Sequence, residues 1–114
     1  MKLKYLLTIS LSILLLISCG DPHEYSVDPT FSEFVHRFEQ EAAKRGKNYQ
    51  LQSSGLIIEF SKLKNDQAGL CHYENPIRIE IDSVYWRKIS QVAGAYYMKE
   101  NLIFHEMGHG ILKR

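Results

Sequence analysis

The chain has no excess of charge of one sign. Its 114 residues include 14 lysines and arginines and 13 aspartates and glutamates, which gives a formal net charge of +1. No basic run and no patterned stripe of lysine or arginine occurs along it. A nucleic-acid-binding protein needs such a basic surface against the phosphate backbone. The composition therefore argues against nucleic acid as a partner.

A hydrophobic run long enough to span a bilayer comfortably is also missing. The main apolar stretch, residues 6–17, is shorter than the roughly 20 residues that a membrane-spanning helix requires. It follows a short basic head, Lys2 and Lys4, and ends in Leu-Ile-Ser-Cys at positions 16–19. Residues 1–18 are therefore predicted to be a signal peptide and not part of the fold.

The end of this segment resembles a bacterial lipoprotein signal. That resemblance implies cleavage before Cys19 and acylation of its thiol, with palmitate among the chains, which gives stable membrane attachment. Because Gly20 and not aspartate follows Cys19, the resemblance favours an outer-membrane lipoprotein of the cell envelope, facing the periplasm or the surface. An ordinary secretory signal or a short uncleaved anchor is the alternative. Removal of two lysines with the signal changes the net charge from +1 to −1.

Cysteine is scarce, with two residues in the whole chain. If Cys19 carries lipid, Cys71 has no partner within the chain. An unpaired cysteine in an exported protein indicates a free thiol, a metal ligand or a bridge to another molecule. We expect a core or free-thiol role for Cys71.

The remaining sequence predicts an α+β domain over residues 30–114, preceded by a tether at residues 19–29 that contains Pro22 and Pro29. A helix is expected to begin at Thr30, with Glu33 completing a capping box, and to end at Gly46 in a left-handed cap. Apolar residues follow the helical period along it, namely Phe31, Phe34, Val35, Phe38 and Ala42.

Two segments alternate between apolar and polar residues and predict the strands of a small mixed sheet, residues 56–61 and 77–82. Residues 65–76 between them are rich in turn-forming residues and are expected to be a loop that holds Gly69, Cys71 and His72. Ser90 is a candidate cap for a long helix that continues to the end of the chain, although Gly94 weakens that assignment.

The sequence His105-Glu106-Met107-Gly108-His109 lies on this last predicted helix. Histidines four residues apart fall on one helix face, where both imidazoles can bind one zinc ion. Zinc lowers the pKa of a bound water, and Glu106 can take its proton during attack on a peptide carbonyl and pass it to the leaving amine. The motif thus predicts a metalloprotease with Zn²⁺ as cofactor, His105 and His109 as metal ligands and Glu106 as the catalytic base. The alternative is a surface helix whose histidines merely bond to neighbours.

The order of these elements is similar to that of a small zincin. Cys71, an isoleucine-rich strand ending in Asp82, Trp86 and the histidine motif with its leader Leu-Ile-Phe resemble the small zinc-metallopeptidase lipoproteins of Bacteroidetes-type bacteria, over residues 31–114. The resemblance implies a zincin-like fold with a long C-terminal active-site helix. It also implies that residues 77–82 form a sheet edge that pairs with an extended peptide; an internal strand is the alternative.

This chain departs from the resembling group at two positions. Gly110 stands where a cysteine is common in the group, which puts in doubt the disulfide that the resemblance would give Cys71. Leu112 stands where the longer metzincin consensus has glycine, so the chain is not assigned to the metzincins proper.

A hydrolytic zinc site needs three protein ligands, and the motif supplies two. In the resembling group a histidine follows soon after the arginine that corresponds to Arg114. We therefore expect the natural reading frame to continue past Arg114 with a histidine within a few residues. The 114-residue chain alone is then expected to bind zinc weakly and to be inactive. Among internal substitutes, His72 is the one worth considering, whereas His36 is expected to be a helix-surface residue.

The sequence thus predicts a membrane-anchored zinc endopeptidase that hydrolyses peptide or protein substrates outside the cytoplasm. The main alternative is a non-catalytic surface lipoprotein that acts as a binding or envelope-interaction module. A peptidoglycan amidase is a weaker alternative, because such zinc sites draw their ligands from strands and scattered positions.

Overall fold

The computed structural model describes residues 24–114 of the chain, so the predicted signal peptide, Cys19 and the first part of the predicted tether lie outside the described residues. Within them the structure is a mixed α+β fold, as predicted. The strands are β1 (Tyr25–Val27), β2 (Leu56–Ser61), β3 (Gly69–His72) and β4 (Arg78–Asp82). The helices are a 3-10 turn, η2 (Pro29–Phe31), and α1 (Ser32–Lys44), α2 (Leu51–Ser54), α3 (Ser83–Ile89) and α4 (Ala95–Ile111).

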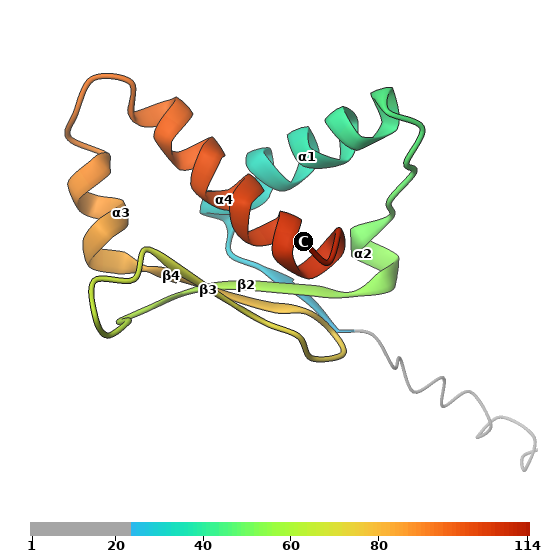
Figure 1. The fold of residues 1–114 in the computed structure, drawn as a ribbon, viewed down its shortest axis with the longest axis horizontal. Coiled ribbons are helices and arrows are strands. Elements are labelled where there is room, and N and C mark those ends of the chain that lie inside the picture. The colour runs from blue at the N-terminus through green and yellow to red at the C-terminus, as the bar shows by residue number, and fades with distance from the viewer. Residues whose placement is uncertain (1–23) are drawn as a thin grey trace, which may run out of the picture.

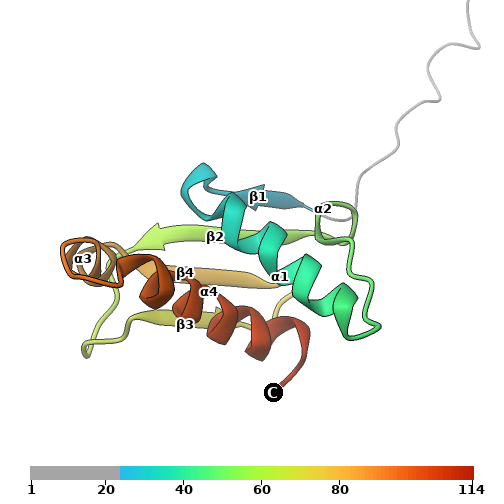
Figure 2. The same ribbon diagram turned by 90° about the horizontal axis from the view of Figure 1, so that it is seen from above.

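The four strands form one sheet in the order β1-β2-β4-β3. Strands β1, β2 and β4 are parallel, whereas β3 runs antiparallel to β4 at the edge of the sheet. Helices α1, α3 and α4 lie on the same face of this sheet (Figure 1). Seen from above, α1 and α4 lie side by side, and α4 follows the edge where β3 lies (Figure 2).

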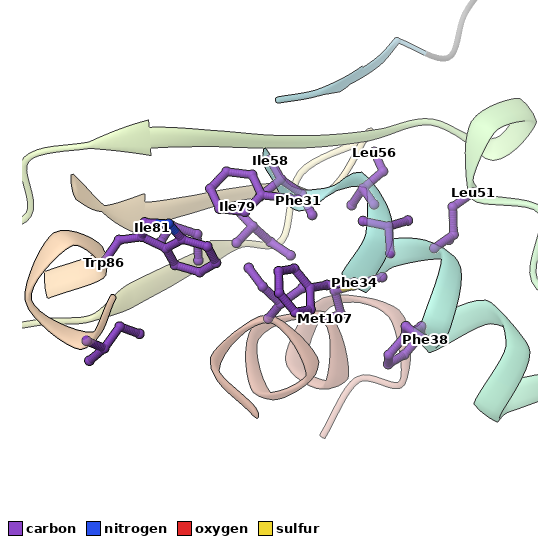
Figure 3. Close-up of a cluster of buried hydrophobic side chains, with 13 residues drawn as sticks. Phe31, Phe34, Phe38, Leu51, Leu56, Ile58, Ile79, Ile81, Trp86 and Met107 are labelled. Carbon is purple, nitrogen blue, oxygen red and sulfur yellow. The ribbon is translucent and has the colours of Figure 1, made fainter. Parts of the chain in front are cut away.

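The hydrophobic core lies between the sheet and the helices (Figure 3). Strands β2 and β4 alternate, so that one side chain in two points toward the helices. The core includes these side chains from the sheet, α1 and α4: Leu56, Ile58, Ile79, Ile81, Phe34, Phe38, Ile103 and Met107. The predicted core faces of both strands are therefore confirmed.

The beginning of α1 differs from the prediction. Pro29 starts a 3-10 turn before the helix, and the Asp28 carboxylate accepts a hydrogen bond from the Thr30 amide at 2.9 Å. Asp28 and not Thr30 thus caps the turn, and α1 itself begins at Ser32. At the other end Gly46 has φ +78°, which confirms the predicted left-handed cap.

The long C-terminal helix begins later than predicted. Gly94 adopts φ +79° at its N-cap, so α4 begins at Ala95 and not near Ser90. The Ser90 hydroxyl instead donates to the Trp86 carbonyl at the end of α3. A left-handed glycine precedes α4, and the separate helix α3 before it was not predicted from the sequence.

Three further expectations are corrected by the sheet. Tyr25–Val27, predicted as tether, pairs with β2 as strand β1. Residues 69–72, predicted as loop, form β3. The strand expected at 77–82 is β4, an internal strand paired on both sides, and the edge beside it is β3. A short strand such as β3 gains its hydrogen bonds from a distant partner, which local sequence does not reveal.

No helix within residues 24–114 combines the length and the apolar character that a membrane crossing requires.

Candidate zinc and general-base site on helix α4

The histidine motif lies on α4, as predicted, and the helix directs its residues to two different environments. His105 and His109 lie on the open side of the helix, where His105 is exposed and His109 is half-buried. Glu106, one residue after His105, is rotated by about 100° around the helix axis and points toward the sheet. Its side chain is buried, with 6% relative exposure.

The two histidine rings converge. Their Nε2 atoms are 3.0 Å apart, and their ring planes are nearly perpendicular, at 88°. Two nitrogens that each bind one zinc ion at about 2.1 Å in tetrahedral geometry lie about 3.4 Å from one another. The pair thus fits a zinc ion with little movement of either ring.

The ring of His109 is also oriented from its other side. Its Nδ1–H donates to the backbone carbonyl oxygen of Arg114. The chain curls back there because Lys113 adopts φ +55° and the Arg114 amide bonds to the Gly108 carbonyl. A proton held on Nδ1 leaves the lone pair of Nε2 for a metal, which is the usual arrangement of zinc-binding histidines.

Glu106 has the environment of a proton acceptor. Burial raises the pKa of its carboxyl group above the ordinary value, and the nearby His105 and His109 partly offset this effect. Within residues 24–114 no hydrogen bond to the carboxylate is present. A carboxylate that is buried and weakly solvated is a stronger base than one in water, and this is the property that a general base needs near neutral pH.

Strand β3 lies directly against α4 at two points. A Cβ atom placed on Gly69 would lie 2.8 Å from Cγ and Oε1 of Glu106, and one placed on Gly110 would lie 2.9 Å from Sγ of Cys71. Two residues along a strand advance about 6.7 Å and four residues along a helix about 6 Å, so both pairs meet in register. Glycine at one position of each pair permits this close approach.

Cys71 therefore has a packing role next to the site. It is half-buried and is a free thiol. Burial raises the pKa of the thiol, and the nearby Glu106 raises it further. The group is thus protonated at neutral pH, in keeping with the expected core or free-thiol role.

His72 is not available as a third ligand. It points away from α4, because β3 alternates and Gly69 and Cys71 face the helix. Its Nε2 atom lies 2.6 Å from Oε2 of Glu80 on β4. His36 is exposed on α1 and lines a separate hollow with residues of β1 and α2. Within residues 24–114 no group of three potential ligands stands close enough to hold a metal ion.

A small hollow of about 260 Å³ lies beside His105, between α3 and α4. Its lining combines aromatic, aliphatic and amide side chains, namely Tyr85, Met98, Asn101, Leu102 and His105. The hollow thus lies next to the face of α4 that carries His105.

The sequence identified the three motif residues but missed Gly69 as a member of the site. A glycine before two residues of strand type, Leu70 and Cys71, was the available signal, because glycine weakens a strand and often marks the close approach of another group. The turn-rich surroundings at residues 65–76 concealed it.

The chain matches no protein-family model, no curated protein and no solved structure.

Proposed function

We propose that this protein is a zinc-dependent endopeptidase with a zincin-like fold, anchored by lipid and acting outside the cytoplasm. The observation that carries the proposal is the arrangement on α4. Two histidine Nε2 atoms converge at 3.0 Å on its open side, and the adjacent Glu106 carboxylate is buried without a hydrogen-bond partner among the described residues. A buried carboxylate without a hydrogen-bond partner destabilises a fold, so its presence indicates a functional and not a structural role.

The residues of the site have distinct tasks in this proposal. A zinc ion held by His105 and His109 would polarise a water molecule and the substrate carbonyl. Glu106 takes a proton from the attacking water and delivers it to the leaving amine. Burial raises the pKa of its carboxyl group above the ordinary value, which makes the carboxylate a stronger proton acceptor.

The position of β3 supports an extended peptide as substrate. It is the edge strand beside α4, and β4 pairs with its other side. A peptide that adds to the free edge of β3 by backbone hydrogen bonds would lie along the helix that carries the histidines. This role replaces the one expected for residues 77–82.

The third zinc ligand stays a prediction. His105 and His109 supply two donors, and a structural or catalytic zinc site uses at least three from the protein. Residues 24–114 supply no third donor beside these two, so zinc held by His105 and His109 alone is expected to bind weakly.

Substitution Glu106→Gln tests the chemistry. In the zinc-loaded protein, E106Q is expected to keep its zinc and to lower peptide hydrolysis at least about a hundredfold, because the amide cannot accept the proton. The measurement is turnover of a fluorogenic peptide library, with zinc content determined on the same samples.

Two further variants serve as controls. H105A and H109A are expected to lose zinc as well as activity. Glu100 is on the same helix but pairs with Arg37 and lies away from the histidines, so E100Q is expected to retain both zinc and activity. Equal turnover by E106Q and the wild-type protein, at equal zinc content, would remove Glu106 from the mechanism. Tight zinc binding without hydrolysis of any peptide would favour the non-catalytic binding module.

A further inference from the structure

Gly69 occupies a strand position where glycine is unfavourable unless space requires it. Its backbone does not have the positive φ that favours glycine; among the glycines of residues 24–114, that conformation occurs at Gly46, Gly55 and Gly94. Gly69 is the first residue of β3 and pairs with Ile81, and glycine in a strand lacks a side chain to pack and costs more chain entropy than other residues. The reason for glycine here is therefore the space beside it.

That space is filled by Glu106. A Cβ atom on Gly69 would lie 2.8 Å from Cγ, 2.8 Å from Oε1 and 2.9 Å from Cδ of the glutamate, distances below 3.0 Å that force a shift. Every side chain other than hydrogen would therefore displace the carboxyl group.

Packing and not hydrogen bonding holds the Glu106 carboxylate in position. Among residues 24–114 none donates to its carboxylate, so packing against β3 sets its position. The Glu106 carboxylate thus lies between the backbone of β3 at Gly69 and helix α4.

We propose that Gly69 is a positioning residue of the catalytic site, whose missing side chain lets the Glu106 carboxylate lie between α4 and the backbone of edge strand β3. This inference rests on the proposed peptidase function. Strand β3 would then position both the Glu106 carboxylate, through Gly69, and the substrate peptide, through its free edge.

The first test is Gly69→Ala in the zinc-loaded protein. Added at this point, a methyl group moves the carboxylate from its place, and a misplacement of about 1 Å can cost a hundredfold in rate. G69A is expected to lower kcat by about tenfold to a hundredfold, with zinc content unchanged and KM changed less than about threefold. Wild-type kcat in G69A would overturn the proposal.

The second test asks whether the effect passes through Glu106. Alanine at position 106 removes Cγ, Cδ and Oε1, the three atoms that the new methyl group would meet. In the E106A background, G69A is therefore expected to change the residual kcat by less than about threefold, although E106A alone is much slower than the wild type. An equal loss in both backgrounds would show that G69A acts through the fold and not through the base.

A third test needs no activity. In the metal-free protein, the denaturation midpoint is compared for wild type, G69A, E106A and the double variant. G69A is expected to lower the denaturation midpoint less in the E106A background than in the wild type, because the crowded Glu106 side chain is absent there. Equal effects in both backgrounds would overturn the contact.

Gly108→Ala is the matched control for this stability cycle, because it adds the same methyl group to α4 where nothing lies within 4 Å. Its denaturation midpoint is expected to stay or rise, since alanine favours helix. Failure of the proposed function is recognised separately. Absence of hydrolysis by the wild-type protein with zinc bound would overturn that function, and with it the role of Gly69, whatever the cycle shows.

Discussion

At the scale of single residues, carboxylates with similar burial have opposite properties in this protein. Glu106 and Asp82 are 6% and 8% exposed, respectively. Burial raises the pKa of Glu106, whereas backbone hydrogen bonds lower the pKa of Asp82. The bond from the Leu63 amide has the largest effect on Asp82, followed by the bond from the Tyr85 amide. The difference lies in the donors: an unsatisfied carboxylate favours its protonated form, and one that accepts two backbone N–H groups favours its charge.

Asp82 is therefore expected to make stability depend on pH. Its carboxylate accepts from the Leu63 amide and the Tyr85 amide, both at 2.8 Å, and it caps α3. Because its folded pKa lies below the unfolded value of about 4, this stabilisation is present above that value and is lost as the pH falls through the folded pKa. D82N is thus expected to be less stable than the wild type at pH 7, by a margin that narrows below about pH 4.

Urea denaturation of both proteins across this pH range measures the margin. Asparagine also caps helices, but it offers one acceptor oxygen in place of two and carries no charge. A constant margin between pH 7 and pH 3 would contradict the assignment of charge to this interaction.

At the scale of elements, the contact between α4 and β3 builds the site. Gly69 on the strand accommodates Glu106, and Gly110 on the helix accommodates Cys71. The resemblance inferred from the sequence raised cysteine as an alternative residue at the position of Gly110, and the structure places that position directly beside Cys71. The two elements thus approach closely enough for a covalent link, although this chain has only one of the two thiols.

Gly110→Cys is expected to form a disulfide with Cys71. The new Cβ atom would lie 2.9 Å from Sγ of Cys71, but also 2.6 Å from Cγ2 of Ile77, so I77A is combined with it to remove the overlap. The variant also carries C19S, which leaves no other thiol. Loss of free thiol in the oxidised protein, and a gain of about 2–4 kcal/mol over its reduced form in the free energy of unfolding, are expected.

The variant with I77A and C19S alone is the matched control, and it should retain one free thiol and show no change on reduction. Two free thiols in the oxidised G110C protein would mean that α4 and β3 lie farther apart than the structure shows.

At the scale of the whole molecule, the helices share one face of the sheet, and the proposed site lies at the edge where α4 meets β3 (Figure 1). Strand β1, at the opposite edge of the sheet, begins at Tyr25, six residues after Cys19. If Cys19 carries lipid, the folded domain follows the anchor closely, and the proposed site would lie near the membrane surface.

Lipid attachment is predicted from residues 16–19 and is tested in cells. Cys19→Ser is expected to abolish labelling by a fatty-acid analogue and either to release the protein from membranes or to leave it unprocessed, because the acylated thiol is lost. Membrane fractionation of the wild type and C71S provides the comparison, since C71S keeps the proposed acylation site. Labelling that persists in C19S would show that the segment is not a lipoprotein signal.

The sequence by itself determined the features that depend on local spacing. The interval of four residues places His105 and His109 on one face of a helix, and alternation gives β2 and β4 their buried faces. The left-handed end of α1 at Gly46 also follows from local residue type, because glycine adopts that conformation without steric cost.

Only the tertiary structure decided which segments meet. Gly69 and Glu106 are 37 positions apart in the sequence, and no local pattern joins them. Strand β3, hidden among turn-forming residues, and β4, internal and not at the edge, depend on hydrogen bonds to distant partners. The raised pKa of Glu106 also depends on the tertiary structure, because its burial is produced by the elements packed around it and not by its neighbours along the chain.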